Sequence, residues 1–106
     1  MKRTYTFVTA RGFVDCEIDG ISIRLPVFVG VLKHPTEQEL RELLVLPQVA
    51  RKYTCEALRK LPWPALRQFP HDWLRACLPA SHLAESRRRA VEFMLSGTMP
   101  ALQSGS

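Results

Sequence analysis

The feature that most constrains this chain is an Asp-Gly pair, Asp19-Gly20, placed between two stretches of alternating apolar and polar residues. Asp-Gly tolerates the positive φ angles of a two-residue type I′ turn, so the pair predicts a β-hairpin over residues 14–25. Counting outward from the turn places Ile18–Ile21, Cys16–Ile23 and Val14–Leu25 on one face, and Glu17–Ser22 and Asp15–Arg24 on the other. A slip of one residue would move every apolar side chain into water, so turn chemistry and alternation predict the same register.

Two flanking segments extend the predicted sheet. Residues 4–9 place Tyr5 and Phe7 on one side and threonines on the other, as in a half-buried strand. Pro26 cannot donate to a ladder, so it ends the second hairpin strand, and residues 27–32 are interpreted as a further strand after a bend. The sequence therefore predicts a small antiparallel β-meander over residues 4–32.

Helices are predicted from residue 36 onward. Thr36, followed three residues later by Glu39, is a capping-box pattern, and leucines at helical spacing come directly after it. Pro47 stops this helix and suits the first position of the next one, and further prolines restrict the remaining chain to short helices. The predicted helices span residues 36–46, 48–61, 64–69, 71–78 and 82–95.

The predicted architecture is α+β, with the apolar face of an N-terminal sheet covered by C-terminal helices. At 106 residues the chain is long enough for one hydrophobic core. We therefore predict a single domain over residues 1–97 and a flexible tail over residues 98–106, where the sequence ends in Gln-Ser-Gly-Ser.

The composition favours a cytoplasmic protein without a membrane span. The longest apolar run, residues 25–32, contains a proline and a glycine and is far shorter than the roughly 20 residues that a bilayer-spanning helix requires. Polar residues alternate through residues 4–9, so a continuous signal-peptide core is not expected. Cys16, Cys55 and Cys77 form no Cys-x-x-Cys pair, and their odd number argues against a closed disulfide framework.

No motif predicts an enzyme, a metal site or a cofactor. His34, His71 and His82 stand in short loops or at predicted helix starts, and the sequence has neither a Gly-x-Ser-x-Gly elbow nor a glycine-rich phosphate loop. Cys55 and Cys77 with two of these histidines have the chemistry of zinc ligands, but no tight knuckle supplies two of them together. We expect no catalytic residue, no bound metal and no cofactor.

Positive charge offers one route to a partner. The formal net charge is +5, and basic residues are concentrated between positions 51 and 89. The predicted basic binding residues are Arg51, Lys52, Arg59, Lys60, Arg87, Arg88 and Arg89. Basic helix faces attract phosphates, although most such faces are only solvated. Nucleic-acid binding by the helices of residues 51–89 is the alternative function.

A non-catalytic role in binding another protein is the leading prediction. The proline-rich segment 62–79 carries large apolar side chains, which would form an anchor patch if exposed and fill the core if buried. These residues are Trp63, Phe69, Trp73 and Leu78. Sheet edges offer a second route, homodimerisation included, because an unpaired strand pairs readily with another chain. The size and the helix composition are typical of small accessory proteins of bacteria, phages and mobile elements, so we predict an adaptor, an inhibitor or an accessory subunit.

Overall fold

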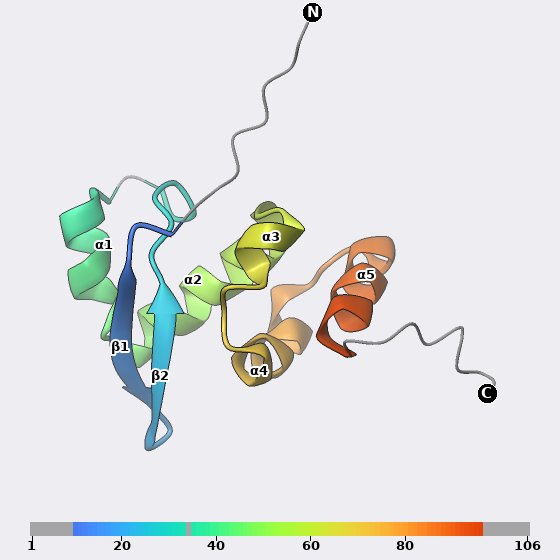
Figure 1. Ribbon diagram of the computed structural model, residues 1–106, viewed down its shortest axis with the longest axis horizontal. Helices are drawn as coiled ribbons and strands as arrows, with labels where there is room; N and C mark the ends of the chain where they lie inside the picture. The colour runs from blue at the N-terminus through green and yellow to red at the C-terminus, as the bar shows by residue number, and fades with distance from the viewer. Residues whose placement is uncertain (1–9, 34, 97–106) are drawn as a thin grey trace, which may run out of the picture.

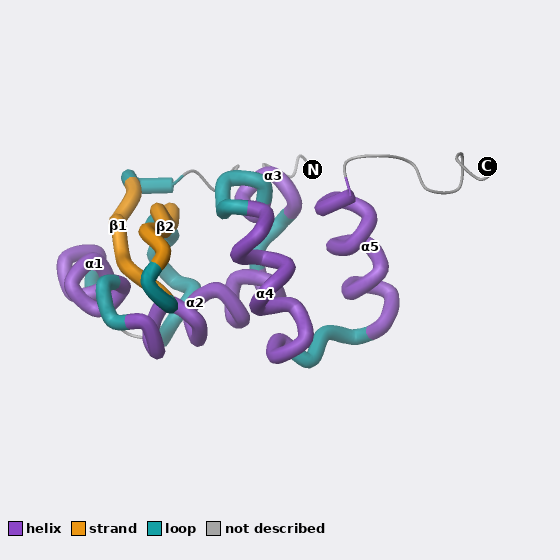
Figure 2. The backbone as a smooth tube through the Cα atoms, turned by 90° about the horizontal axis from the view of Figure 1, so that it is seen from below, coloured by secondary structure: helices purple, strands orange, loops and turns teal. Residues whose placement is uncertain are grey.

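The computed structural model describes residues 10–33 and 35–96, which fold as an α+β protein with one hairpin followed by helices (Figure 1). The elements are β1 (Phe13–Ile18), β2 (Ile21–Pro26), α1 (Glu37–Leu44), α2 (Pro47–Lys60), α3 (Trp63–Leu66), α4 (His71–Ser81) and α5 (Glu85–Ser96). α1 and the hairpin lie at one end and α5 at the other, with α2 between them (Figure 2). The predicted strand of residues 4–9 and the predicted tail lie outside the described residues.

The hairpin register predicted from the turn is confirmed. Ile18 pairs with Ile21 and every other predicted pair follows, out to Val14 opposite Leu25. Asp19 and Gly20 have φ angles of 54° and 78°, as a type I′ turn requires. The apolar face is buried at the centre of the hairpin and opens toward the tip, where Ile21 is 64% exposed.

The chain after β2 is a loop, so the prediction of a further strand over residues 27–32 is wrong. Val27 still pairs with the chain before β1, donating to the carbonyl of Gly12 and accepting from the amide of Arg11. Beyond it the backbone turns at Gly30, whose φ of 98° suits glycine. Val27, Phe28 and Val31 are buried although they belong to a loop, whereas Val29 is 49% exposed. The amide of Phe28 bonds to Tyr53 of α2 and not to a neighbouring strand.

The Tyr53 hydroxyl holds this loop to α2. The hydroxyl donates to the carbonyl of Pro26 at 2.6 Å and accepts from the amide of Phe28 at 2.7 Å. All three groups lie in the core, where Phe28 stacks on Phe69 with ring centroids 6.0 Å apart. Burial raises the pKa of Tyr53, so the hydroxyl stays protonated and able to donate. One phenol thus satisfies two backbone groups that the end of the strand leaves unpaired.

The first two helices begin where the sequence predicts. The Thr36 hydroxyl accepts from the amide of Glu39, and the Glu39 carboxylate accepts from the amide of Thr36, which is the predicted capping box. Pro47 occupies the first turn of α2, where its missing N–H costs no helical hydrogen bond.

The later helices differ from their predicted bounds. α3 is shorter than predicted, and α4 continues through Pro79 to Ser81. A proline in the last turn forfeits one backbone bond, and the buried Ser81 hydroxyl, which donates to the carbonyl of Leu78, stabilises that turn. His82 was predicted to start the last helix, but it has a φ of 54° and ends α4 in the left-handed conformation.

The Tyr53→Phe variant tests the importance of the phenol. Removing the hydroxyl leaves a buried amide and a buried carbonyl without their partner, so we expect a loss of about 2 to 3 kcal/mol in the free energy of unfolding. Urea denaturation measures this loss, and amide exchange at Phe28 should accelerate. A change below about 0.5 kcal/mol would contradict the role assigned to Tyr53.

Candidate binding surfaces

The predicted apolar anchor patch is mostly core, which corrects the prediction for three of its four residues. Phe69, Trp73 and Leu78 are all buried, with Trp73 only 6% exposed. The indole N–H of Trp73 donates to the Thr54 hydroxyl at 2.7 Å, which ties α4 to α2. Proline-broken backbone needs large side chains to fill the space between its short helices, and these rings do so. Trp63 is 36% exposed and remains at the surface.

Arg87, a predicted binding residue, caps the end of α2 instead. Its guanidinium donates to the carbonyls of Leu58 and Leu61 at 2.7 and 2.6 Å, and it lies 4.6 Å from the centre of the Trp63 ring. Burial lowers the pKa of Arg87. Cations at a helix C-terminus satisfy carbonyls that have no partner within the helix. This side chain therefore joins α5 to α2 and is not available to a phosphate.

Most of the other predicted basic residues are also engaged. Arg51 pairs with Asp19 at the hairpin turn, and Arg59 donates to the carbonyl of Ser81 while pairing with Glu56. Arg88 and Arg89 pair with acidic residues of their own helix. Lys60 pairs with Glu56 and donates to the carbonyl of Val31. Six of the seven residues thus bond to groups of this chain, which leaves fewer free cations than nucleic-acid binding would favour.

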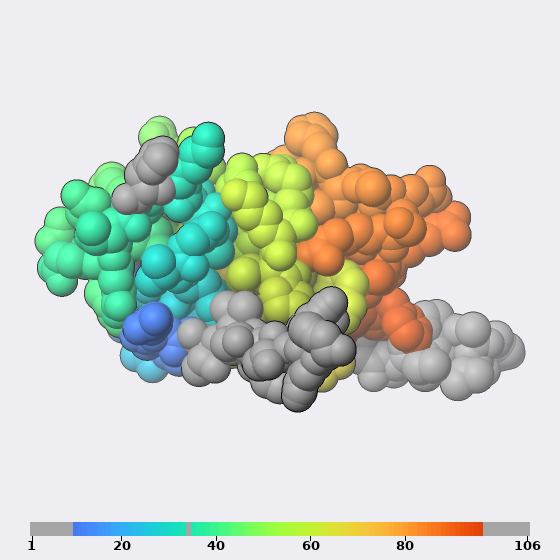
Figure 3. Space-filling view, turned by 90° about the horizontal axis from the view of Figure 1, so that it is seen from above, coloured from blue at the N-terminus to red at the C-terminus, as the bar shows by residue number. Residues whose placement is uncertain are grey.

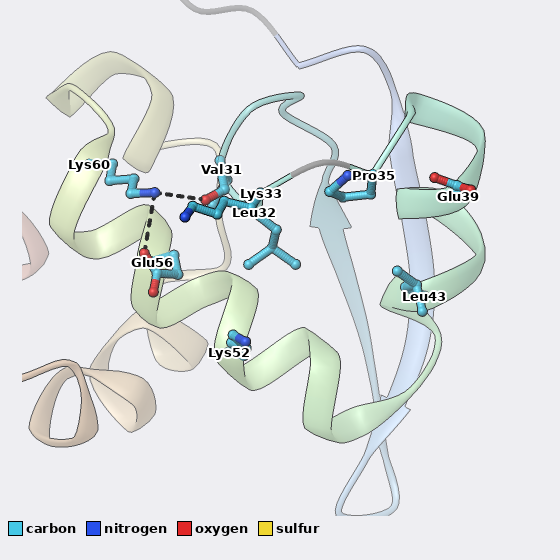
Figure 4. A pocket seen from close by; sticks show the side chains of 9 residues that line it. All are labelled: Val31, Leu32, Lys33, Pro35, Glu39, Leu43, Lys52, Glu56 and Lys60. Atoms are coloured by element: carbon cyan, nitrogen blue, oxygen red, sulfur yellow. Dashed lines mark hydrogen bonds and ion pairs between the residues drawn. The ribbon is translucent and has the colours of Figure 1, made fainter.

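Within residues 10–33 and 35–96, the basic side chains without an ion pair or hydrogen bond are Lys33, Lys52 and Arg67. Two of these three line the same groove. We call it the lysine groove; its lining residues are Val31, Leu32, Lys33, Pro35, Glu39, Leu43, Lys52, Glu56 and Lys60. It lies between α1, α2 and the loop after β2 and has a volume of about 440 Å³ (Figure 4).

The loop after β2 and the helices α1 and α2 contribute both charged and apolar groups to the lysine groove. Leu32 lies between α1 and α2, and the Lys60 amine reaches both the Val31 carbonyl and Glu56 (Figure 4). The hydrogen bond from Arg59, with help from Lys60, keeps the pKa of Glu56 below its usual range, so this carboxylate is charged at neutral pH. Leu43 adds an apolar wall that is 37% exposed. The arrangement offers apolar contact next to unpaired positive charge.

A second groove follows the outer edge of β2. We call it the edge groove; it has a volume of about 500 Å³ and is lined by Ile18, Asp19, Ile21, Ser22, Ile23, Arg24, Pro70, Asp72, Trp73 and Ala76. Successive side chains of a strand point to opposite faces of the sheet. Four successive residues of β2 can therefore line one groove only if that groove runs along the edge of the strand. α4 forms the opposite wall.

The pairing pattern shows which backbone groups face the edge groove. In an antiparallel pair, residues whose N–H and C=O groups bond across the ladder alternate with residues whose groups point away. Ile18 and Ile21 flank the turn and form a bonded pair, so the groups of Ser22 and Arg24 point outward. Within the part of the chain that the structure describes, the sheet has only two strands, and no backbone bond reaches these groups.

The three thiols, of which Cys55 is half-buried and the others buried, are expected to be weakly reactive. Burial raises the pKa of Cys16 and Cys55, and it raises that of Cys77 to about 12. A thiol that stays protonated at neutral pH is a weak nucleophile and a poor metal ligand. Among the described residues, no three side chains of the His, Cys, Asp and Glu types gather where they could hold a metal ion.

The sequence analysis predicted neither groove, although the hairpin register contained a signal for the edge groove. The hairpin register already implies that the backbone N–H and C=O groups of Ser22 and Arg24 point away from β1. What it does not reveal is that the other edge lies toward α1 while this one opens on a groove (Figure 1). Lys33 and Lys52 are 19 positions apart in the chain, and only the packing of the loop against α2 brings them to one groove.

Comparisons with family models, with curated proteins and with solved structures find no match to this chain. In the described residues, no helix has both the length and the apolar character needed to cross a bilayer. The two grooves are therefore the features of this chain that bear on its function.

The structural role of Arg87 predicts a contrast with Arg89. Arg87→Ala removes two charge-assisted bonds to buried carbonyls, so we expect a loss of about 2 kcal/mol in the free energy of unfolding. Arg89→Ala removes one exposed ion pair and should cost less than about 0.5 kcal/mol. Urea titration of both variants decides the matter, and equal losses would show that Arg87 is not a capping residue.

The protonated thiols predict a loss of stability in alkali. The ordinary pKa of a cysteine thiol is 9.0. Above this pH, Cys77 ionises in the unfolded chain but stays protonated in the folded protein. The folded protein then holds more protons than the unfolded one, so its stability falls as pH rises, by up to about 1.4 kcal/mol per pH unit for each such group. Thermal unfolding between pH 8 and 10 should show this decline, and Cys77→Ala should reduce its slope. An unchanged slope in that variant would refute the assignment.

Proposed function

We propose that this chain is a small non-catalytic binding protein, acting as an adaptor, inhibitor or accessory subunit, and that it binds a short extended strand of a partner protein in the edge groove. The observation that carries the proposal is the free edge of β2, with four successive residues lining one groove. An unpaired edge is a template for strand addition, in which backbone bonds supply affinity and side-chain pockets supply selectivity.

The edge itself limits the length of the bound strand. Ser22 and Arg24 each offer one donor and one acceptor, and beyond them Pro26 has no N–H to offer. The Asp19-Gly20 turn closes the other end. A partner strand would therefore pair over only a few residues, as is typical of short peptide motifs.

The side chains of the groove favour one orientation of that strand. Ile21 and Ile23 of β2 face the apolar side, where Trp73 and Ala76 of α4 and the preceding Pro70 form the opposite wall. Apolar residues of the partner would occupy this side, and its polar residues would lie beside Arg24 and Ser22. Because a helix closes the groove, one added strand suits the space better than a two-stranded ribbon from a second copy of the chain.

Nucleic-acid binding remains the alternative, and it has less support. Six of the seven predicted basic residues bond to carbonyls or carboxylates of this chain, and an engaged cation releases fewer counterions on binding a phosphate. Trp63, whose exposed ring would be needed to stack on a base, has Arg87 against it.

A peptide selection tests the proposal. A display library of random peptides of about eight residues, selected on the full chain, should yield sequences in which apolar residues recur at every second position. On binding, the amides of Ser22 and Arg24 should become protected from hydrogen exchange. Enrichment of helical or acidic sequences that leave these amides unprotected would count against strand addition.

A matched pair of proline variants provides the control. Ser22→Pro removes an outward N–H from β2 and should weaken the selected peptides by at least about tenfold. Glu17→Pro removes the outward N–H of the residue directly opposite, on the edge of β1, and should leave binding within about twofold. Equal effects of the two variants would sink the proposal. Sedimentation of the chain alone reports whether a second copy occupies the groove instead.

A further inference from the structure

The lysine groove is separate from the edge groove and shares no residue with it. We propose that it binds a segment of a partner protein that carries acidic and apolar side chains on one face. This proposal concerns a second surface, so it stands or falls independently of strand addition at β2. It is supported by two charges that have no partner among the described residues and by the apolar surface between them.

The unpaired charge in this groove is positive. Both of its carboxylates already have partners, since Glu39 accepts from the amide of Thr36 and Glu56 pairs with Arg59 and Lys60. The amines of Lys33 and Lys52 have no partner among the described residues. The groove therefore presents uncompensated positive charge, and an acidic ligand complements it.

The surface between the amines is apolar. Val31 is buried and forms part of the floor, with Leu32 and Pro35 beside it and Leu43 as an exposed wall. Val45 and Leu46, which follow α1 in the chain, are also each close to half exposed. Lysine amines at the rim of such a surface suit an amphipathic peptide, because its acidic residues reach the amines while its apolar residues leave water.

The same features disfavour a nucleic acid in this groove. None of the nine described residues that line it is aromatic, so none of them can stack on a base. No arginine lines the groove to grip a phosphate in the bidentate manner. Apolar contact combined with a few amines fits a peptide chain better.

Three synthetic peptides of about 12 residues provide the probe. They share one set of leucines at helical spacing and carry glutamate, glutamine or lysine at the remaining positions. Fluorescence anisotropy with the full chain should rank glutamate first, with the affinity falling as salt rises from about 0.05 M to about 0.5 M because added ions screen the lysines. If the glutamine or lysine peptide binds as tightly as the glutamate peptide, the proposal is wrong.

Charge-reversal variants locate the site. Lys52→Glu combined with Lys33→Glu should weaken the glutamate peptide by about tenfold or more. Arg67→Glu makes the same kind of change at an unpaired cation outside the groove and should shift the affinity by less than about twofold. Circular dichroism checks that each variant is folded, and Lys52→Gln, a milder change on the surface of α2, should give an intermediate loss. Equal weakening by Arg67→Glu would show a non-specific charge effect and overturn the proposal.

Two further measurements separate the remaining outcomes. Ser22→Pro should leave binding of the glutamate peptide unchanged, so failure of one groove is distinguishable from failure of the other. Single-stranded and duplex DNA oligonucleotides are titrated in parallel. DNA binding that is lost in the Lys33 and Lys52 double variant, with no binding of the glutamate peptide, would overturn the peptide proposal in favour of a phosphate-binding surface.

Discussion

The structure depends on one phenol. The Tyr53 hydroxyl joins the carbonyl of Pro26 to the amide of Phe28, at the point where the hairpin ends and regular pairing stops. Without it, the loop after β2 would bury two backbone groups with no partner, at a cost of about 1 to 3 kcal/mol each. With it, the loop packs on α2 and contributes Val31 to the core. The hairpin, the loop and α2 become one unit, which forms one wall of each groove, while α4 closes the edge groove and α1 the lysine groove.

Charge in this protein is used in two ways. Arginines mainly join parts of the fold. Arg87 donates to a carbonyl at the end of α2, Arg59 donates to the carbonyl of Ser81, and Arg51 pairs with Asp19 at the hairpin turn. A planar guanidinium with several donors suits carbonyl capping better than an ammonium does. In the part of the chain that the structure describes, Lys33 and Lys52 bond to no such group. The positive charge that is available to a partner therefore lies with the lysines beside α1 and α2, away from the arginine-rich α5 at the opposite end of the molecule (Figure 3).

The two grooves offer different kinds of contact on either side of the hairpin unit. The edge groove provides unpaired backbone groups beside an apolar wall, which suit the main chain of an extended strand. The lysine groove provides amines around an apolar floor, which suit an acidic ligand. A protein with two such surfaces could hold two partners or two segments of one, which is how an adaptor or an accessory subunit works.

The sequence by itself determined those parts of the protein that depend on interactions between residues close together in the chain. The Asp19-Gly20 turn and the period-two alternation set the hairpin register, and Thr36 with Glu39 set the start of α1, because each involves residues within a few positions of one another. Tertiary structure alone decided the rest. Whether Trp73 is an anchor or a core residue, whether residues 27–32 form a strand or a loop, and whether Arg87 meets a phosphate or a helix end depend on distant neighbours. Burial and partner choice are set by packing between segments far apart in the chain, and no local pattern encodes them.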